Sequence, residues 1–215
     1  MKRIEPVPGC GSVYAEASTI AALRGEPALA ADVQSAHNPG GRRVCERLAA
    51  RVLLRRLLTE VAGPGVAGLP LEARPAGQPF LAARPEIGVS LSHTSGWVAA
   101  AVHLCGAVGV DVQVPVSASD RLVRRCCTPS AQRAMFGLPQ ADRDTELAWI
   151  WSVQEACVKA AGLGLAGLPW TIPVEVGEDG GGWRDIRWLA FRHRWPVAVS
   201  CAHAPGSRDD PPCAD

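Results

Sequence analysis

The chain has 215 residues, 47% of them hydrophobic and 20% charged, which suffices for one large or two small domains with a sizeable core and excludes a largely disordered chain. Its 22 Lys and Arg residues nearly balance 21 Asp and Glu residues, so the basic excess typical of a nucleic-acid binder is missing and we expect no nucleic-acid partner. Lys2 and Arg3 precede no apolar run and no later stretch reads as a membrane span, so we expect a cytoplasmic protein without a membrane partner.

The first strongly periodic segment is residues 41–62, which we predict to be a long helix. Val44, Leu48 and Val52 recur at four-residue spacing and mark its apolar side. A second row at the same spacing consists of Arg43, Arg47, Arg51 and Arg55. Residues 63–79 are rich in Gly and Pro and are predicted to form a loop.

Three strands are expected next, over residues 87–91, 97–104 and 108–114. Cys105 and Gly106 are typical of a two-residue hairpin turn between the second and the third strand. In the third strand the valines alternate with polar or small residues. Asp111 and Gln113 therefore lie side by side on one face, where Gly109 leaves room.

The rest of the chain is predicted to be mixed. Residues 119–136 look helical with a break at Pro129, and residues 141–161 form a second long helix that ends at Gly162. Further strands are expected near residues 170–176, 183–191 and 195–203, followed by a loose polar tail from Ser207.

The two halves of the sequence share a faint echo. The segment from His93 to His103 resembles the one from His193 to His203, since each has a Trp, a run of small apolar residues and a final His. We interpret this echo as a duplication of one α+β unit. Two unrelated apolar strands explain it equally well.

The cysteines show no metal-binding spacing. There is no C-x-x-C motif and no Cys/His pair at zinc-finger spacing, so we expect free thiols in a reducing compartment. The eight are Cys10, Cys45, Cys105, Cys126, Cys127, Cys157, Cys201 and Cys213.

Lys159 is unusual because only Lys2 and Lys159 are lysines, whereas 20 residues are Arg. Glu155 precedes it by one helical turn, so the two side chains share a face. On an arbitrary helix this would be a surface ion pair of about 0.3–0.5 kcal/mol. The scarcity of lysine and the apolar surroundings, with Trp149 and Trp151, favour a functional pair instead.

Asp111 is the second candidate for chemistry. A carboxylate within a valine-rich strand is costly unless it has a cation or hydrogen-bond partner, although a solvent-facing Asp at a strand end is the alternative. Asp111 and Glu155 together could offer hard oxygen ligands to Mg²⁺.

Four segments, in this order, resemble the motifs of 4′-phosphopantetheinyl transferases of the larger, surfactin-synthetase-activating (Sfp) type. They are G-Q-P at 77–79, V-S-L-S-H-T at 89–94, V-G-V-D-V-Q at 108–113 and W-S-V-Q-E-A-C-V-K-A-A-G-L-G at 151–164. The resemblance implies an α+β fold: a pseudo-dimer of two similar halves, each a small, mainly antiparallel sheet packed against a long helix. The expected halves are residues 1–105 and 106–206, followed by a loose tail over 207–215.

The resemblance also implies an enzyme of carrier-protein activation in polyketide or nonribosomal peptide biosynthesis. It would act as a monomer, with Mg²⁺ and coenzyme A bound in the cleft between the halves. The 4′-phosphopantetheine group would pass to a serine of an apo acyl or peptidyl carrier protein, leaving 3′,5′-ADP. The alternatives are a catalytically weakened protein that only binds coenzyme A or a carrier, and a phosphate-ester hydrolase.

Residue roles follow from the same resemblance. Asp111, Gln113 and Glu155 would hold the metal, and Glu155 would also help to deprotonate the serine. Lys159 would balance charge on the transferring phosphate and protonate the leaving group. Coenzyme A would be bound by Lys159, Gln78, Ser92, His93, Thr94 and an arginine of the set Arg42, Arg43 and Arg47, for which a solvated helix face is the alternative.

Three glutamines depart from the family pattern. Gln113 stands where the family usually has Glu, and Gln78 and Gln154 stand where Lys is frequent. All three changes reduce charge near the expected cofactor, so we expect weaker metal binding and altered coenzyme affinity.

Overall fold

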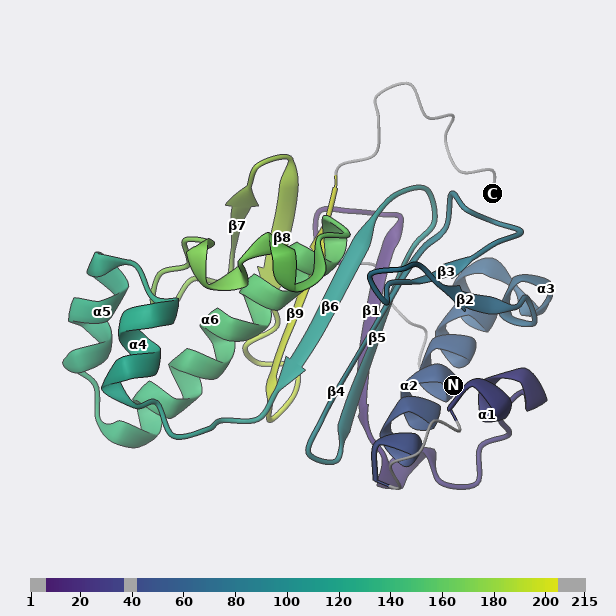
Figure 1. The fold of residues 1–215 in the computed structure, drawn as a ribbon, viewed down its shortest axis with the longest axis horizontal. Coiled ribbons are helices and arrows are strands. Elements are labelled where there is room, and N and C mark those ends of the chain that lie inside the picture. Colours follow the sequence, from purple (N-terminus) through teal and green to yellow (C-terminus); the bar gives the residue numbers. More distant parts are fainter. Residues whose placement is uncertain (1–6, 37–41, 205–215) are drawn as a thin grey trace.

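The computed structural model describes residues 7–36 and 42–204 (Figure 1). The strands are β1 Val13–Thr19, β2 Leu71–Ala73, β3 Pro79–Leu81, β4 Gly88–Thr94, β5 Trp97–His103, β6 Val108–Gln113, β7 Gly180–Trp183, β8 Ile186–Ala190 and β9 Ala198–His203. The helices are α1 Ala30–Ala36, α2 Arg42–Ala62, α3 Pro64–Ala67, α4 Asp120–Cys126, α5 Pro129–Phe136 and α6 Gln140–Ala160, with short 3₁₀ turns at Ala21–Leu23, Gly164–Gly167 and Pro169–Thr171.

Two antiparallel sheets occupy the centre. The first has the order β1-β5-β4 and the second β6-β9-β8-β7, while β2 and β3 form a small separate ribbon. The predicted α+β class with small antiparallel sheets is therefore confirmed. The pseudo-dimer and the boundaries of the two halves stay predictions, and the expected tail over 207–215 lies outside the described residues.

Each sheet carries one long helix on its outer face. Apolar residues of α2 pack on β4 and β5 of the first sheet, and those of α6 pack on the second sheet. The inner faces of the two sheets meet in a third core built from residues such as Val13, Ala101, Val110 and Cys201. In Figure 1 the two helices accordingly lie on opposite sides of the molecule, with the sheets between them. In the described part of the chain no helix is both long and apolar enough to cross a membrane.

The strongly periodic helices were predicted well. The helices expected over 41–62 and 141–161 are α2 and α6, and the helix expected over 119–136 is interrupted at Pro129 as α4 and α5. Apolar periodicity over five or six turns is a robust local signal, and Pro at a first helical position marks a new start.

Several weaker expectations were wrong. The predicted hairpin at Cys105 and Gly106 does not form, because β5 is already flanked by β1 and β4 and the chain passes into the other sheet. No strand forms over residues 170–176, where a 3₁₀ turn leads into a loop. The predicted loop 63–79 contains α3 and β2. The strand expected near 183–191 is found in shorter form as β8, because residue 183 still belongs to β7.

The C-terminal part of the arginine row is structural rather than a solvated face. Arg55 Nε and Arg51 Nη1 each donate to the Asp32 carboxylate at 2.9 Å. Arg55, only 9% exposed, also donates from Nη1 to the carbonyls of Ala67 and Leu69, at 2.8 and 2.6 Å. These bonds hold α1 and the segment after α3 against α2.

Asp32→Asn is expected to lower the free energy of unfolding at pH 7 by about 3 kcal/mol, because it leaves a buried guanidinium without its counter-charge. Burial opposes ionisation, but hydrogen bonds from Arg55 and Arg51 lower the pKa of Asp32 overall. The stabilisation that ionised Asp32 provides is therefore complete above the ordinary Asp pKa of about 3.9. It is lost as the pH falls through the lower pKa that Asp32 has in the folded protein. Urea titrations of both proteins at pH 7 and under acid conditions measure the difference.

Asp142→Asn, at an exposed site on α6, is the matched control and should change stability by less than about 0.5 kcal/mol. A loss for Asp32→Asn that stays the same at acid pH would contradict the role given to the ionised carboxylate.

Candidate functional site

The site begins with the close approach of α6 to β6. Gly109 permits it, because a Cβ atom at this position would lie 2.0 Å from the Ala156 carbonyl oxygen and 2.5 Å from the Ala160 nitrogen. The sequence placed Gly109 and Asp111 on one face of the strand, and that face is the one that α6 covers. Lys159 is thereby brought over Asp111.

The carboxylate of Asp111 is buried, with 3% of the residue exposed, and accepts three hydrogen bonds. Lys159 Nζ and Ser92 Oγ each donate to Oδ1 at 2.6 Å, and Gln113 Nε2 donates to Oδ2 at 3.2 Å. Lys159 Nζ donates in addition to the Val110 carbonyl at 3.0 Å. The solvent-facing alternative for Asp111 is therefore wrong, and the ion pair of Lys159 is made with Asp111.

Serine hydroxyls join the two sheets at this point. β4 and β6 are edge strands of different sheets. Ser90 Oγ accepts from the Val110 backbone nitrogen at 3.0 Å and Ser92 Oγ from that of Val112 at 3.3 Å. These hydroxyls thus satisfy backbone donors that a neighbouring strand would otherwise pair. Ser92 gives its own proton to Asp111, so its hydroxyl orients the carboxylate.

Glu155 lies close to this arrangement, with its carboxyl half-buried. Burial raises the pKa of Glu155, the negative charge of Asp111 raises it further, and Lys159 lowers it. Two carboxylates near enough to repel each other fit a divalent cation, and Gln113 can add its amide oxygen because its nitrogen donates to Asp111. The donor set of Asp111, Glu155 and Gln113 therefore suits Mg²⁺.

A cavity of about 260 Å³ opens beside Glu155 and Lys159. Residues 76–79, β4 of the first sheet and α6, which packs on the second sheet, all line it. Gln78 belongs to the lining and donates from Nε2 to the Lys159 carbonyl at 3.4 Å. Since pockets for whole ligands of drug size span about 300–1,000 Å³, this cavity suits only a part of a large ligand.

The remaining predicted cofactor residues lie farther along β4. His93 Nδ1 is 3.2 Å from Glu46 Oε2, so the end of β4 adjoins the first turns of α2. The partly exposed Arg47 follows Glu46, and the partly exposed Thr94 ends β4. Arg42 and Arg43 begin α2, but their side chains lie outside the described residues. The predicted set is thus divided between the cavity and the end of β4, about 10 Å apart along the strand.

The expectation for Gln154 was wrong. This side chain is fully buried and donates from Nε2 to the carbonyls of Cys126 and Ile172, at 2.7 and 2.9 Å. It holds α4 and the segment after the last 3₁₀ turn against α6 and does not line the cavity. Sequence reasoning also missed Ser90, whose position two residues before Ser92 was the available signal.

Glu155→Gln is expected to stabilise the metal-free protein at pH 7, raising Tm by a few degrees. An acid whose folded pKa is raised binds its proton more tightly in the folded state, so stability falls as the pH rises through the ordinary Glu pKa of about 4.3 towards the folded value. At pH 7 the neutral amide of the Glu155→Gln variant removes the free-energy cost of holding an ionised carboxylate at this half-buried position. Thermal melts in a chelator at pH 7 and at pH 4 measure the gain, which should vanish at the lower pH.

Glu60→Gln, at an exposed position on α2, is the control and should leave Tm unchanged at both pH values. A Glu155→Gln protein that melts below wild type at pH 7 would show that the ionised Glu155 carboxylate does not destabilise the folded protein.

Comparison with known proteins gives two findings. Residues 107–214 match the family described as the 4′-phosphopantetheinyl transferase superfamily. A curated relative, a 4′-phosphopantetheinyl transferase of Bacillus subtilis, is 25% identical over 131 residues, which are 60% of this chain and 57% of the relative. The match thus spans little more than half the length of that relative. Asp111, Gln113, Glu155 and Lys159 all lie within the range that matches the family.

Proposed function

This chain belongs to the 4′-phosphopantetheinyl transferase superfamily, and from that premise we propose that it transfers 4′-phosphopantetheine from coenzyme A to a serine of an apo acyl or peptidyl carrier protein. The observation that carries the proposal is the convergence of Asp111, Glu155 and Lys159, of which Glu155 and Lys159 line a cavity between β4 and α6. A buried carboxylate, a carboxyl with a raised pKa and a cation in one place are the groups that phosphoryl transfer needs.

In this proposal Asp111, Glu155 and Gln113 would hold Mg²⁺, which would supply positive charge near the pyrophosphate of coenzyme A. The serine oxygen forms a bond to the phosphorus that carries pantetheine, and the bond from that phosphorus to the oxygen of 3′,5′-ADP breaks. Glu155 takes the serine proton, since burial and Asp111 raise its pKa towards the working pH. Lys159 stabilises the charge on the transferring phosphate and can protonate the leaving oxygen.

We place coenzyme A from the cavity along β4 to the start of α2. Gln78 borders the cavity, and His93, Thr94 and the arginines at positions 42, 43 and 47 lie towards the other end. Ser92 acts as a positioning residue, because its hydroxyl is committed to Asp111.

The direct test combines the purified chain with Mg²⁺, coenzyme A and an apo carrier protein. Transfer adds about 340 Da to the carrier through a covalent bond, which intact-protein mass spectrometry detects. The gain should disappear in a chelator and with a carrier whose acceptor serine is Ala. Coenzyme A binding without a mass gain on several carriers, even at high Mg²⁺ or Mn²⁺, would instead favour the binding-protein alternative. Cleavage of coenzyme A without any carrier would favour the hydrolase.

A groove next to Gln113 supports the choice of a carrier protein as partner. It has a volume of about 180 Å³ and an apolar lining that includes Val116, Leu122 and Trp151. Val116 is 54% and Leu122 39% exposed. Arg121 and Arg124 are exposed on α4, the helix that contributes Leu122 to the lining, and their positive charge fits the acidic helices that carrier proteins usually present.

The double variant Arg121→Glu/Arg124→Glu should raise KM for an acidic carrier about tenfold and leave kcat and the affinity for coenzyme A nearly unchanged, because rim charges act on association. Steady-state kinetics with varied carrier, at low and high salt, measure the effect, which should shrink as salt increases. Arg24→Glu, exposed in the N-terminal part, is the control. A change in kcat with an unchanged KM would contradict docking at this groove.

A further inference from the structure

His103 and His203 end the central strands of the two sheets. β5 lies between β1 and β4, and β9 lies between β6 and β8. The two imidazole rings are tilted to each other with their centroids 6.0 Å apart. The strands that echo each other in the sequence therefore bring their final histidines together where the two sheets meet.

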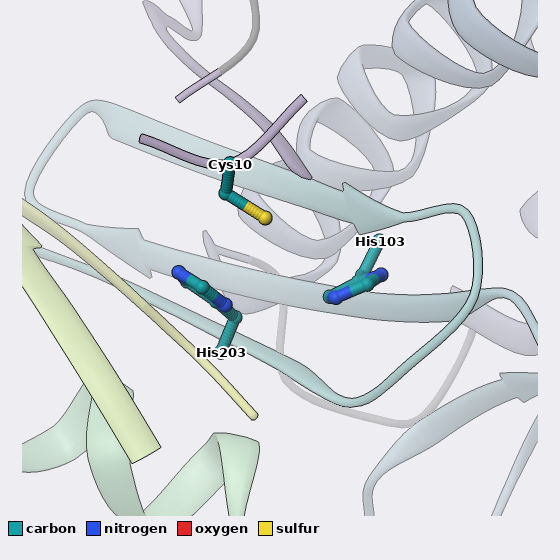
Figure 2. Close-up of side chains that lie close together, drawn as sticks. All are labelled: Cys10, His103 and His203. Atoms are coloured by element: carbon teal, nitrogen blue, oxygen red, sulfur yellow. The ribbon is translucent and has the colours of Figure 1, made fainter. Parts of the chain in front are cut away.

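Cys10 completes this group from a third segment. Its sulfur and one nitrogen of each imidazole all lie within 4.8 Å of one another. Figure 2 shows the three side chains converging from different parts of the chain. The turn that carries Cys10 is fixed by backbone hydrogen bonds, since Val7 N donates to Val13 O at 2.7 Å and Cys10 N to Val7 O at 3.0 Å.

The two rings are also held in orientation. Cys105 N donates to Nδ1 of His103 at 3.1 Å, and Nδ1 of His203 lies 3.3 Å from the Ala204 carbonyl oxygen. Metal-binding histidines usually donate the hydrogen of the ring nitrogen that does not bind the metal. Nδ1 of His203 donates in this way to the Ala204 carbonyl, which leaves Nε2 of His203 for an ion. Nδ1 of His103 instead accepts from Cys105 N, so the proton of the neutral ring is on Nε2. Binding through Nε2 of His103 would require that proton to move to Nδ1, with loss of the hydrogen bond from Cys105, and the Cys10 thiol would release its proton.

The chemistry of these donors selects the ion. A thiolate with two imidazoles suits zinc and similar divalent transition metals, whereas Mg²⁺ prefers oxygen ligands. His103 and His203 are 1% and 9% exposed, and Cys10 is partly exposed. Since zinc lies about 2.0–2.3 Å from such ligands, tetrahedral donors are roughly 3.3–3.7 Å apart. Donor atoms that are now within 4.8 Å of one another would therefore approach each other by up to about 1.5 Å on binding.

A route to the cluster exists. A cavity of about 580 Å³ is bordered by Val7, Pro8 and Gly9, by the β7–β8 hairpin and by His203. Of the three proposed ligands only His203 lines this cavity, so an ion and a water molecule as fourth ligand would enter on the His203 side. The cluster is separate from the carboxylate site, because His203 pairs with Val108 at the start of β6 and Asp111 lies about 10 Å farther along that strand.

We propose that Cys10, His103 and His203 bind one zinc-class divalent ion, which fastens the segment before β1 to the central strands of both sheets. This site is independent of the function proposed above and would add stability at the junction of the sheets.

The test uses the full chain stripped of metal and titrated with Zn²⁺ in competition with a coloured chelator, and separately with Co²⁺. We expect one tightly bound equivalent, a thiolate-to-cobalt charge-transfer band and a higher Tm with Zn²⁺. Cys10→Ser should abolish the band and weaken Zn²⁺ binding at least about 100-fold, and His203→Gln should weaken it comparably. Cys45→Ser, which removes an exposed thiol on α2, should behave as wild type.

Circular dichroism checks that each variant is folded. The two variants change different segments, the turn before β1 and the end of β9, so misfolding of one does not decide the result. Absence of a tight equivalent in wild type would overturn the proposal. Retention of that equivalent and of the cobalt band in both folded variants would overturn it too, since the ion would then be bound by other thiols.

Discussion

Asp111→Asn is expected to lower kcat/KM for phosphopantetheine transfer by at least about 1000-fold while the protein stays folded. The amide keeps the shape of the side chain, and its oxygen can still accept from Ser92 and Lys159. It lacks the negative charge that the proposed metal site needs and that pairs with Lys159 at 2.6 Å. Initial rates of carrier modification over a range of Mg²⁺ concentrations, together with urea titrations, separate loss of chemistry from loss of stability.

Asp111→Ala provides the harsher comparison. It removes the acceptor for Ser92 and leaves the partly buried Lys159 ammonium without its carboxylate, so stability should fall along with activity. Asp142→Asn, at its exposed position on α6, should retain wild-type rates. Substantial activity in the folded Asp111→Asn protein at low Mg²⁺ would remove Asp111 from the proposed metal site, whatever the behaviour of the Ala variant.

Local patterns in the sequence predicted the elements that carry this site. The four-residue periodicity placed Glu155 and Lys159 on one face of a long helix, and the two-residue alternation placed Asp111 beside Gly109. Both are properties of neighbouring residues. The ion-pair partner of Lys159 was not predicted from spacing, because Asp111 reaches it only through the packing of α6 on β6.

Long-range pairings were beyond reach for the same reason. The turn residues Cys105 and Gly106 favoured a hairpin. These local residues carry no information about β1, which lies far earlier in the chain and pairs with one edge of β5. The Cys10, His103 and His203 cluster was invisible to spacing rules, which detect ligands only within short motifs. The β4–β6 junction depends on serine hydroxyls that take the place of backbone hydrogen bonds between strands. Alternation of apolar and polar residues in the sequence does not predict such a junction.

Gly109→Ala is the strongest test of that packing. The added methyl would meet backbone atoms of α6 at 2.0 and 2.5 Å, which cannot rotate away as a side chain could, so the helix must move. We expect a loss of about 3 kcal/mol in the free energy of unfolding. Transfer should fall about 100-fold even in the folded fraction, because Glu155 and Lys159 move with the helix and displacements near 1 Å are costly to catalysis.

Gly11→Ala is the matched control, because a Cβ atom there would meet nothing within 4 Å, and both stability and activity should be preserved. Urea titrations and carrier-modification rates on the same preparations give the two readouts. If the Gly109→Ala protein kept both, α6 would have to lie farther from β6 than described, and Lys159 could not then bridge from the helix to the Asp111 carboxylate. The proposed arrangement of metal ligands and cation therefore depends on this one residue without a side chain.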